Sequence, residues 1–390
     1  MLLWEAPDGE EIAGIGAAAR ISASGDARFE EARLGIAQAL DAAAHRGPLP
    51  DGFPGAIAVG GFSFAADEPR GGWPGFPDAL FFVPERLFWR RRGGRTIETR
   101  WSVSSVGRAD GDATPDPPCA ARGMSRESWG AAVRATLERV HEGAISKAVL
   151  ARSLDLDLGP RTDPVGILER LRSAYPGCYR FLIADGRGGV FLGASPERLV
   201  RLAEGAVSTE AVAGTIRSGP GADDEPLAIA LTQSSKDRAE HEMVLRHLVD
   251  TLRPSCSSLH APAHPGVMRL PHLFHLRTPV EGRALGNPNI LDLVSRLHPT
   301  PAVAGLKREA ALEWIRSAEA LSRGWYAGAV GWVNARGEGD FAVGIRSLAI
   351  RGTRARVFAG AGIVAGSDPD REWEETEIKM KGILDALARR

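Results

Sequence analysis

The chain has 390 residues, of which 44% are hydrophobic and 25% charged, the balance of an ordinary globular protein. Its formal net charge of −1 gives no electrostatic basis for binding nucleic acid or an anionic membrane surface. No apolar run approaches the ~20 residues of a membrane helix, and the N-terminus lacks the basic start of a signal peptide. The three cysteines, Cys119, Cys178 and Cys256, are too scattered for a disulfide framework or a zinc site. We therefore expect a soluble cytoplasmic protein.

Residues 1–120 predict a β-rich region with one helix, because Arg28–His45 carries apolar residues at helical spacing. We expect three strands in this region: Ala56–Ala65, Leu80–Trp89 and Thr96–Val103. The last two form a hairpin. A loop rich in Gly, Pro and Asp over 107–123 then separates this region from residues 121–390, or crosses the surface of a single domain. Nothing in the first region carries obvious chemistry.

A lysine lies in the next predicted strand. Ser125 is a suitable N-cap for a helix that runs to His141, and a strand follows over Ile145–Leu158. Within this strand Lys147 shares a face with apolar residues. It lies either at a strand end, where its ammonium reaches water, or in a pocket, where desolvation lowers its pKa. Spacing alone favours the first position, because fully buried lysines are rare.

A glutamate marks a break between strands. The strand expected over Val190–Ala194 runs into Pro196, which ends the hydrogen-bond ladder and leaves Glu197 at the break. Active-site residues are often found at such places. A surface glutamate paired with Arg198 or Arg201 explains the sequence equally well.

Two helices carry acidic pairs at the same spacing. One long helix is expected over Asp224–Leu252, where Asp237 and Glu240 are three residues apart. A helix near the C-terminus repeats this spacing with Glu372 and Glu375. A solvated helix end explains the second pair on its own. Two pairs on separate helices are, however, what an oxygen-ligand site for Mg²⁺ needs.

The C-terminal part of the chain predicts an antiparallel meander. Its strands are expected at Ala327–Asn334, Asp340–Ile350 and Arg354–Ile363. Arg346 lies inside the second strand, either as a clamp for a carboxylate or on a solvated face. Gly360 and Gly362 in the third strand allow a ligand to approach the backbone closely. Lys379 shares the face of Glu375 on the helix that follows.

Together these segments resemble the chorismate-utilising enzyme family from Ser146 to the C-terminus. The motifs that carry the resemblance, in family order, are SKAVLAR (Ser146–Arg152), FLGASPERL (Phe191–Leu199), AGTIRSG (Ala213–Gly219), SSKDRAEHEMV (Ser234–Val244), HLRTPVEG (His275–Gly282), LHPTPAVAG (Leu297–Gly305), YAGAVGW (Tyr326–Trp332), FAVGIRS (Phe341–Ser347) and AGAGIVAGSDPDREWEET (Ala359–Thr376). Within the family the pattern is most similar to the isochorismate synthases.

The resemblance implies an α/β fold of the α+β type. It is one large chorismate-binding domain, like component I of anthranilate synthase, with antiparallel sheets in a layered sandwich and helices outside. The site lies between the two halves. Residues 1–120 would supply one edge of that core, and residues 121–390 the catalytic region.

The resemblance also implies a role for each site residue. Lys147 would be the general base that takes a proton from water, and Glu197 the general acid that protonates the departing hydroxyl. Mg²⁺ would be bound directly by Glu240 and Glu375 and through its waters by Asp237 and Glu372. The substrate would contact Gly214, Thr215, His275, Ala302, Tyr326, Arg346, Gly360, Gly362 and Lys379.

The implied activity is the Mg²⁺-dependent, reversible conversion of chorismate to isochorismate, for menaquinone or catechol siderophore biosynthesis. Water adds at C2 and the C4 hydroxyl leaves, so no glutaminase subunit is expected. Two alternatives remain: a salicylate synthase, which also expels pyruvate, and a non-catalytic relative that binds chorismate. Ala302 favours isochorismate as the product, because salicylate synthases tend to carry threonine at that position.

Overall fold

The protein was analysed as a computed structural model that describes residues 1–45, 49, 53–66, 76–103, 124–159, 162–218 and 224–388. The predicted loop over 107–123 lies outside the described residues, and so does a boundary at residue 120. Over the described ranges, no helix is both long and apolar enough to cross a bilayer.

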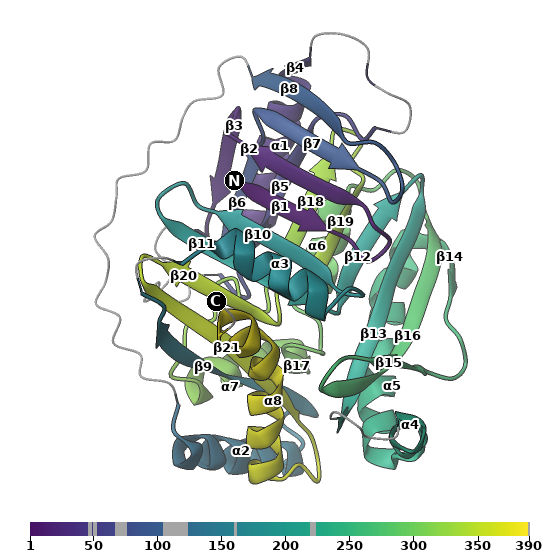
Figure 1. Cartoon of the computed structure of the whole chain (residues 1–390). Coiled ribbons are helices and arrows are strands. Elements are labelled where there is room, and N and C mark those ends of the chain that lie inside the picture. Colours follow the sequence, from purple (N-terminus) through teal and green to yellow (C-terminus); the bar gives the residue numbers. More distant parts are fainter. Residues whose placement is uncertain are drawn as a thin grey trace.

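Two antiparallel sheets form the body of the molecule (Figure 1). The first, called sheet I here, has the strand order β17 (Gly305–Leu306), β9 (Lys147–Asp157), β21 (Arg354–Ile363), β20 (Ser347–Arg351), β11 (Gly189–Ser195), β10 (Tyr179–Ala184), β1 (Leu2–Glu5), β2 (Glu11–Ile15), β7 (Arg86–Arg90), β8 (Ile97–Val103) and β4 (Ala43–His45). Sheet II has the order β14 (Cys256–His260), β16 (Leu273–Ala284), β13 (Ala206–Arg217), β12 (Arg198–Ala203), β19 (Gly339–Val343), β18 (Ala329–Asn334), β5 (Ile57–Phe62), β6 (Ala79–Val83) and β3 (Ala19–Ala23), and β15 (Gly266–Arg269) pairs with β16. Strands from the first hundred residues lie together at one end of each sheet.

The main core lies where the two sheets face each other. Phe181 and Phe191 from sheet I belong to the same buried cluster as Phe62, Phe81 and Val330 from sheet II. Each of these side chains is fully buried. The apolar faces of both sheets are therefore removed from water by one another, which is the main stabilising term in a layered fold.

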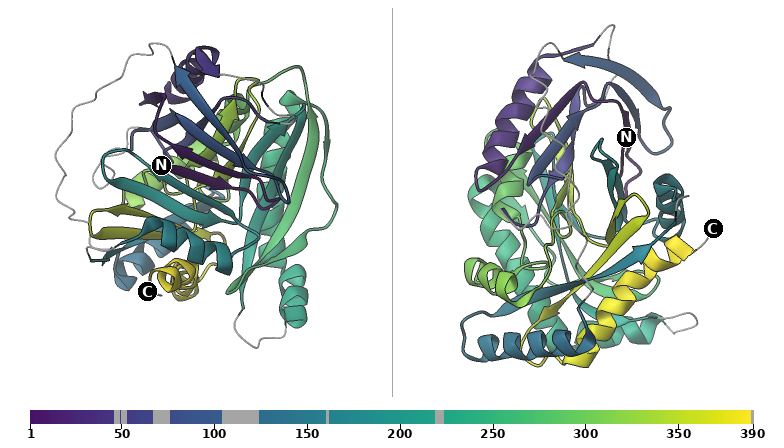
Figure 2. Two further views of the ribbon diagram at one scale, coloured as in Figure 1. Left: turned by 45° about the horizontal axis from the view of Figure 1, so that its top comes forward. Right: turned by 90° about the vertical axis from the view of Figure 1, so that its left-hand side faces the viewer.

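Helices cover the outer faces of the sheets. They are α1 (Arg28–Asp41), α2 (Arg126–His141), α3 (Pro164–Ala174), α4 (Asp224–Gln233), α5 (Ser235–Leu252), the 3₁₀ turn η1 (Arg253–Ser255), α6 (Ile290–Leu297), α7 (Arg308–Ala318) and α8 (Pro369–Ala388). Figure 2 shows α1 and α8 on opposite sides of the strands. α5 packs against β13 and β16, whereas α8 packs against β21. The predicted layered sandwich with outer helices is confirmed.

Two predicted strands are wrong because the chain changes sheet within them. The segment Asp340–Ile350 is divided between β19 in sheet II and β20 in sheet I, so the three C-terminal strands do not form a meander. Arg346 lies at the crossing, with a left-handed φ of 49°. Leu80–Trp89 likewise breaks at Pro84 into β6 and β7. Hydrophobic patterning shows which residues are buried, but not which sheet buries them.

One predicted helix is also divided. The segment Asp224–Leu252 forms α4 and α5, which meet at Ser234. The Ser234 hydroxyl accepts a hydrogen bond from the Asp237 amide at 3.3 Å and begins α5 as its N-cap. This cap places Asp237 in the first turn of α5, where the helix dipole favours its negative charge.

Candidate active site

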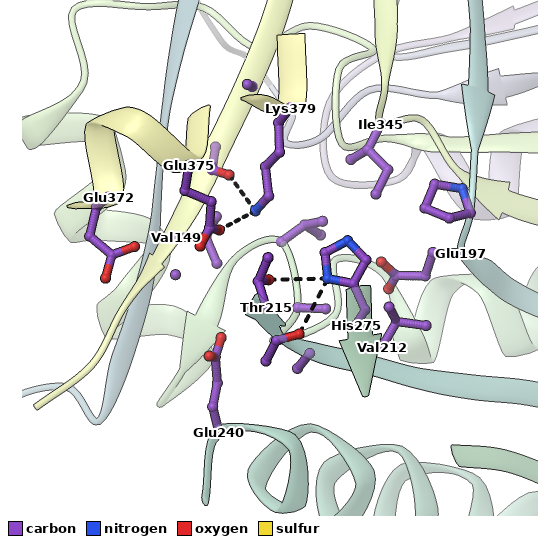
Figure 3. A pocket seen from close by; sticks show the side chains of 18 of the residues that line it. Val149, Glu197, Val212, Thr215, Glu240, His275, Ile345, Glu372, Glu375 and Lys379 are labelled. Carbon is purple, nitrogen blue, oxygen red and sulfur yellow. Dashed lines mark hydrogen bonds and ion pairs between the residues drawn. The ribbon is translucent and has the colours of Figure 1, made fainter. Parts of the chain in front are cut away.

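One pocket between the sheets is lined by all the residues that the sequence predicted for the site. They are Lys147, Glu197, Gly214, Thr215, Asp237, Glu240, His275, Ala302, Tyr326, Arg346, Gly360, Gly362, Glu372, Glu375 and Lys379. In the view of Figure 3, Thr215 and His275 lie between the carboxylates of α5 and α8 on one side and Glu197 on the other. The pocket therefore has two ends, which differ in their electrostatics.

Lys147 is the first residue of β9, and its side chain is only 1% exposed. The prediction that its ammonium reaches water is therefore wrong. Its Nζ forms an ion pair with Oε1 of Glu240 at 2.8 Å. A Cβ at Gly362, on the neighbouring strand, would lie 2.7 Å from Glu240 Oε1 and 3.0 Å from Lys147 Cε. The glycine leaves the space in which this pair forms.

Glu240 keeps its charge in this setting. Burial, the largest single effect, opposes ionisation of its carboxyl group, but the charge and hydrogen bond of Lys147 together with the charges of Lys379 and Lys236 outweigh it. The net result is a pKa below the ordinary value for glutamate. Glu240 is thus a carboxylate at neutral pH, suited to binding a cation or accepting a hydrogen bond.

Glu197 lies where the chain crosses from β11 in sheet I to β12 in sheet II. It is 5% exposed, and Arg198 and Arg201 approach Asp340 at 3.8 Å, so the prediction of a surface ion pair is wrong. Burial raises the pKa of Glu197 to about 8, and the negative charge of Glu210 adds to this effect. The carboxyl group is thus mostly protonated at pH 7 and is available as a proton donor.

The first two turns of α5 and α8 bring the acidic pairs to the other end of the pocket. Lys236 Nζ lies 3.3 Å from Glu372 Oε1 and connects the two helices. Lys379 Nζ lies 2.5 Å from Glu375 Oε1 and donates to the Gly360 carbonyl at 2.9 Å. Glu372 is 5% exposed, so the prediction of a solvated helix end is wrong.

Contacts with β9 fix the position of α8. The Arg152 guanidinium lies over the ring of Trp373 at 3.7 Å, and its Nε donates to Thr376 Oγ1 at 2.7 Å. Both partners lie on the first half of α8, close to Glu372 and Glu375. The strand that begins with Lys147 therefore also positions the helix with the second acidic pair.

The acidic residues offer only oxygen donors, which suits a hard cation such as Mg²⁺. Among the described residues, no three or more His, Cys, Asp or Glu side chains are grouped closely enough to hold a metal by themselves. Burial raises the pKa of Glu372 to about 7, and the nearby charge of Glu375 contributes. The carboxylates present fit a cation bound by two of them, with water as its remaining ligands.

His275 and Arg346 form one hydrogen-bonded unit. Burial and the charges of Arg346 and Lys379 lower the pKa of His275 well below its ordinary value, so its ring is neutral. Nδ1 lies 3.3 Å from the Gly214 carbonyl, which accepts only, so Nδ1 carries the proton. Nε2 then accepts a hydrogen bond from Arg346 Nη2 at 3.2 Å. Arg346 lines the pocket, and its predicted alternative on a solvated face is wrong.

Tyr326 closes the pocket beside Arg346. Its ring stacks on Phe358 with centroids 5.0 Å apart and an interplanar angle of 11°. Burial raises the pKa of its phenol to about 12, so the hydroxyl remains a hydrogen-bond donor. A Cβ at Gly360 would lie 3.2 Å from this hydroxyl oxygen.

The sequence prediction missed Lys236, which lines the pocket and pairs with Glu372. A signal was present, because Lys236 and Glu240 are four residues apart and share a helix face. It also missed apolar wall residues such as Val212 and Ile345, for which we find no sequence signal.

Known proteins resemble the chain over its full length. A family model described as "Chorismate binding enzyme" matches residues 1–114 and 108–388. The salicylate biosynthesis isochorismate synthase of Pseudomonas aeruginosa is 41% identical over 269 residues, which are 69% of this chain and 56% of that relative. The isochorismate synthase MenF of Bacillus subtilis is 35% identical over 355 residues, 85% of this chain and 75% of that relative. The structure of MenF, the menaquinone-specific isochorismate synthase from Escherichia coli, has a TM-score of 0.80 at 27% identity and covers 99% of this chain and 88% of that one.

Proposed function

This chain belongs to the chorismate binding enzyme family, and we propose that it is an isochorismate synthase, which converts chorismate to isochorismate reversibly. The observation that carries the proposal is the presence of both Lys147 and Glu197 in one pocket. A buried amine and a mostly protonated carboxyl group line the same pocket, as a reaction that takes one proton and gives another requires.

In the proposed reaction, Lys147 removes a proton from a water molecule as the water oxygen bonds to C2 of the ring. Removal requires the neutral form of the amine. The ring double bonds shift, and the bond between C4 and its hydroxyl oxygen breaks. Glu197 gives its proton to this leaving group, which departs as water. One water enters and one leaves, so substrate and product are isomers.

The remaining polar residues hold the substrate. Arg346 and Tyr326 offer donors to the carboxylate of the enolpyruvyl group, while the neutral ring of His275 lies beside the cyclohexadiene. Lys379 and the Gly214–Thr215 backbone complete the cradle. The small side chain of Ala302 faces this space.

Mg²⁺ is the cation that we propose for the acidic end of the pocket. Glu240 and Glu375 would bind it directly, and Asp237 and Glu372 would hold its waters. When bound, the cation supplies positive charge that neutralises the ring carboxylate. Asp237 is held in place because its Oδ1 accepts the amide of Thr215 at 3.1 Å.

The product would serve menaquinone or catechol siderophore biosynthesis. Because water is the nucleophile, the reaction needs no subunit that supplies ammonia. The protein would therefore act without a glutaminase partner.

The test is product analysis after incubation with chorismate and Mg²⁺. We expect isochorismate, the same final mixture when the reaction starts from isochorismate, and no turnover after the metal is chelated. Salicylate with pyruvate as the products, or a requirement for ammonia, would contradict the assignment. Tight chorismate binding without any turnover would support a non-catalytic relative instead.

A further inference from the structure

We propose that Glu210 is a positioning residue for Glu197: it fixes the backbone that carries this proton donor and places a negative charge near its carboxyl group. The proposal rests on the proposed function of Glu197 as the general acid. Glu210 itself is absent from the residues that line the pocket, so it acts through Glu197 and does not touch the substrate.

Glu210 is a buried member of β13, only 5% exposed. Its Oε1 accepts the backbone amide of Arg198 at 2.9 Å, and Arg198 follows Glu197 directly. Its Oε2 accepts Nε–H of Arg277, on the neighbouring strand β16, at 2.5 Å. The carboxylate of Glu210 is thus held between two strands and the sheet crossing.

The sheet crossing needs this contact because its backbone pairing is irregular. The register between β12 and β19 shifts between Arg198 and Val200. The backbone of Glu197 itself makes two hydrogen bonds: its amide donates to Ser195 Oγ at 3.2 Å, and its carbonyl accepts the Val343 amide at 3.1 Å. Glu210 completes this set by binding the next amide along the chain. The direction of the Glu197 side chain is therefore set by hydrogen bonds to its backbone.

The charges around Glu197 come from several elements. Lys147 on β9, Lys379 on α8 and Arg346 at the other sheet crossing all favour its ionised form. Burial and the charge of Glu210 oppose them, and the balance raises the pKa of Glu197 to about 8. Arg277 is 46% exposed, so water screens its positive charge more than the negative charge of buried Glu210. Burial, the largest of these effects, and the charge of Glu210 together offset the three cations that favour loss of the proton.

The charge effect is testable without turnover. The Glu197 carboxyl group can be followed by infrared spectroscopy, because its band is the one lost in Glu197→Gln. A pH titration of this band gives the titration midpoint of Glu197. In Glu210→Gln, which keeps an acceptor oxygen for the Arg198 amide, we expect the midpoint to fall by about one pH unit. Truncation of the half-exposed partner, Arg277→Ala, should move it upward. An unchanged midpoint in both variants would overturn the charge effect.

A matched control separates this effect from general damage to the fold. Glu5 on β1 is 4% exposed and pairs with Arg180 at 2.5 Å, but it lies outside the pocket. Glu5→Gln therefore removes a similarly buried ion pair and should leave the Glu197 midpoint unchanged. A shift as large as that of Glu210→Gln would show that the effect is not specific to Glu210 and would overturn the proposal.

The positioning effect is tested by turnover. Glu210→Ala removes the acceptor for the Arg198 amide, so kcat at pH 6, where Glu197 is protonated, should fall roughly tenfold or more with KM little changed. In Glu210→Gln, kcat at pH 6 should stay within about twofold of the wild-type value. As the pH is raised, however, kcat of this variant should begin to fall at a lower pH than kcat of the wild type. Wild-type kcat at pH 6 in Glu210→Ala would overturn the positioning effect. Absence of any turnover in the wild type would instead reject the proposed function, whereas the titration would still decide the charge effect.

Discussion

The two ends of the pocket contain the same residue type in opposite states. Glu240, at the end formed by α5 and α8, is partly buried and paired with Lys147, and its pKa is lowered. Glu197, at the sheet crossing, is buried beside the negative charge of Glu210, and its pKa is raised to about 8. Environment and not residue type therefore suits one glutamate to binding a cation and the other to donating a proton.

Removal of the amine at the first end should have the largest effect. In Lys147→Ala we expect kcat to fall by ~10²–10⁴-fold, because the variant lacks the general base of the proposed reaction, while chorismate binding is largely kept. Steady-state kinetics and a binding titration measure the two quantities. Lys381→Ala, on the exposed side of α8, is the control. Near-normal turnover in Lys147→Ala would mean that the base is a different group.

A methyl group added at Gly362 should disturb the end of the pocket that holds Lys147 and Glu240, because it displaces these side chains without changing their chemistry. In Gly362→Ala the added Cβ would lie 2.7 Å from Glu240 Oε1, so the pair of Lys147 and Glu240 must move. Displacement on the order of 1 Å costs about 10²-fold in turnover. Gly177→Ala is the control, because nothing lies within 4 Å of its added Cβ. Equal activity of the two variants would contradict the tight geometry.

The second end predicts an unusual dependence of stability on pH. The folded-state pKa of Glu197, about 8, lies above its ordinary value of 4.5. The folded protein therefore binds more protons than the unfolded chain between these values, and its stability falls as pH rises through this window. The side chain of Glu197→Gln cannot lose a proton. As the pH rises through this window, the free energy of unfolding of the variant minus that of the wild type should therefore increase by up to about 1.4 kcal/mol per pH unit.

Denaturant unfolding of both proteins between pH 5 and pH 8 measures this difference. A gap that stays constant over the range would mean that the Glu197 carboxyl group is already ionised at neutral pH, like that of Glu240. The contrast between the two ends of the pocket would then be lost.

Removal of the exposed lysine should have the smallest effect. Lys236 is 44% exposed, and its ion pair with Glu372 is screened by water. In Lys236→Ala we expect less than a tenfold change in turnover, with a weaker dependence on salt. A loss as large as that of Lys147→Ala, measured in the same kinetic assay, would place Lys236 in the chemistry.

Much of the local structure could be predicted from the sequence. Ser125 caps α2 as expected, Ile145–Leu158 contains β9, and Arg354–Ile363 is β21. Caps and alternation are signals within one segment. The sheet that a strand joins depends on distant strands, and so the sequence did not show that Asp340–Ile350 changes sheet.

The site was less accessible to spacing alone. Local patterns favoured an exposed Lys147, and a paired surface glutamate explained Glu197 equally well, because burial of a charge depends on partners far along the chain. Lys147 forms an ion pair with Glu240, which lies 93 residues further along the chain, and hydrophobic periodicity within one segment cannot predict such a contact. The family motifs named the residues that line the pocket, whereas Glu210 became visible only from its contacts.

The central claim is that water adds at C2 while the C4 hydroxyl leaves, and isotope transfer tests it most directly. The enzyme is incubated with chorismate and Mg²⁺ in H₂¹⁸O, and isochorismate is taken at early time points, before the reverse reaction spreads the label. We predict one ¹⁸O per isochorismate, in the C2 hydroxyl, from the water that Lys147 deprotonates in the proposed reaction. Unlabelled isochorismate would show that the hydroxyl moves within the substrate and would contradict the account.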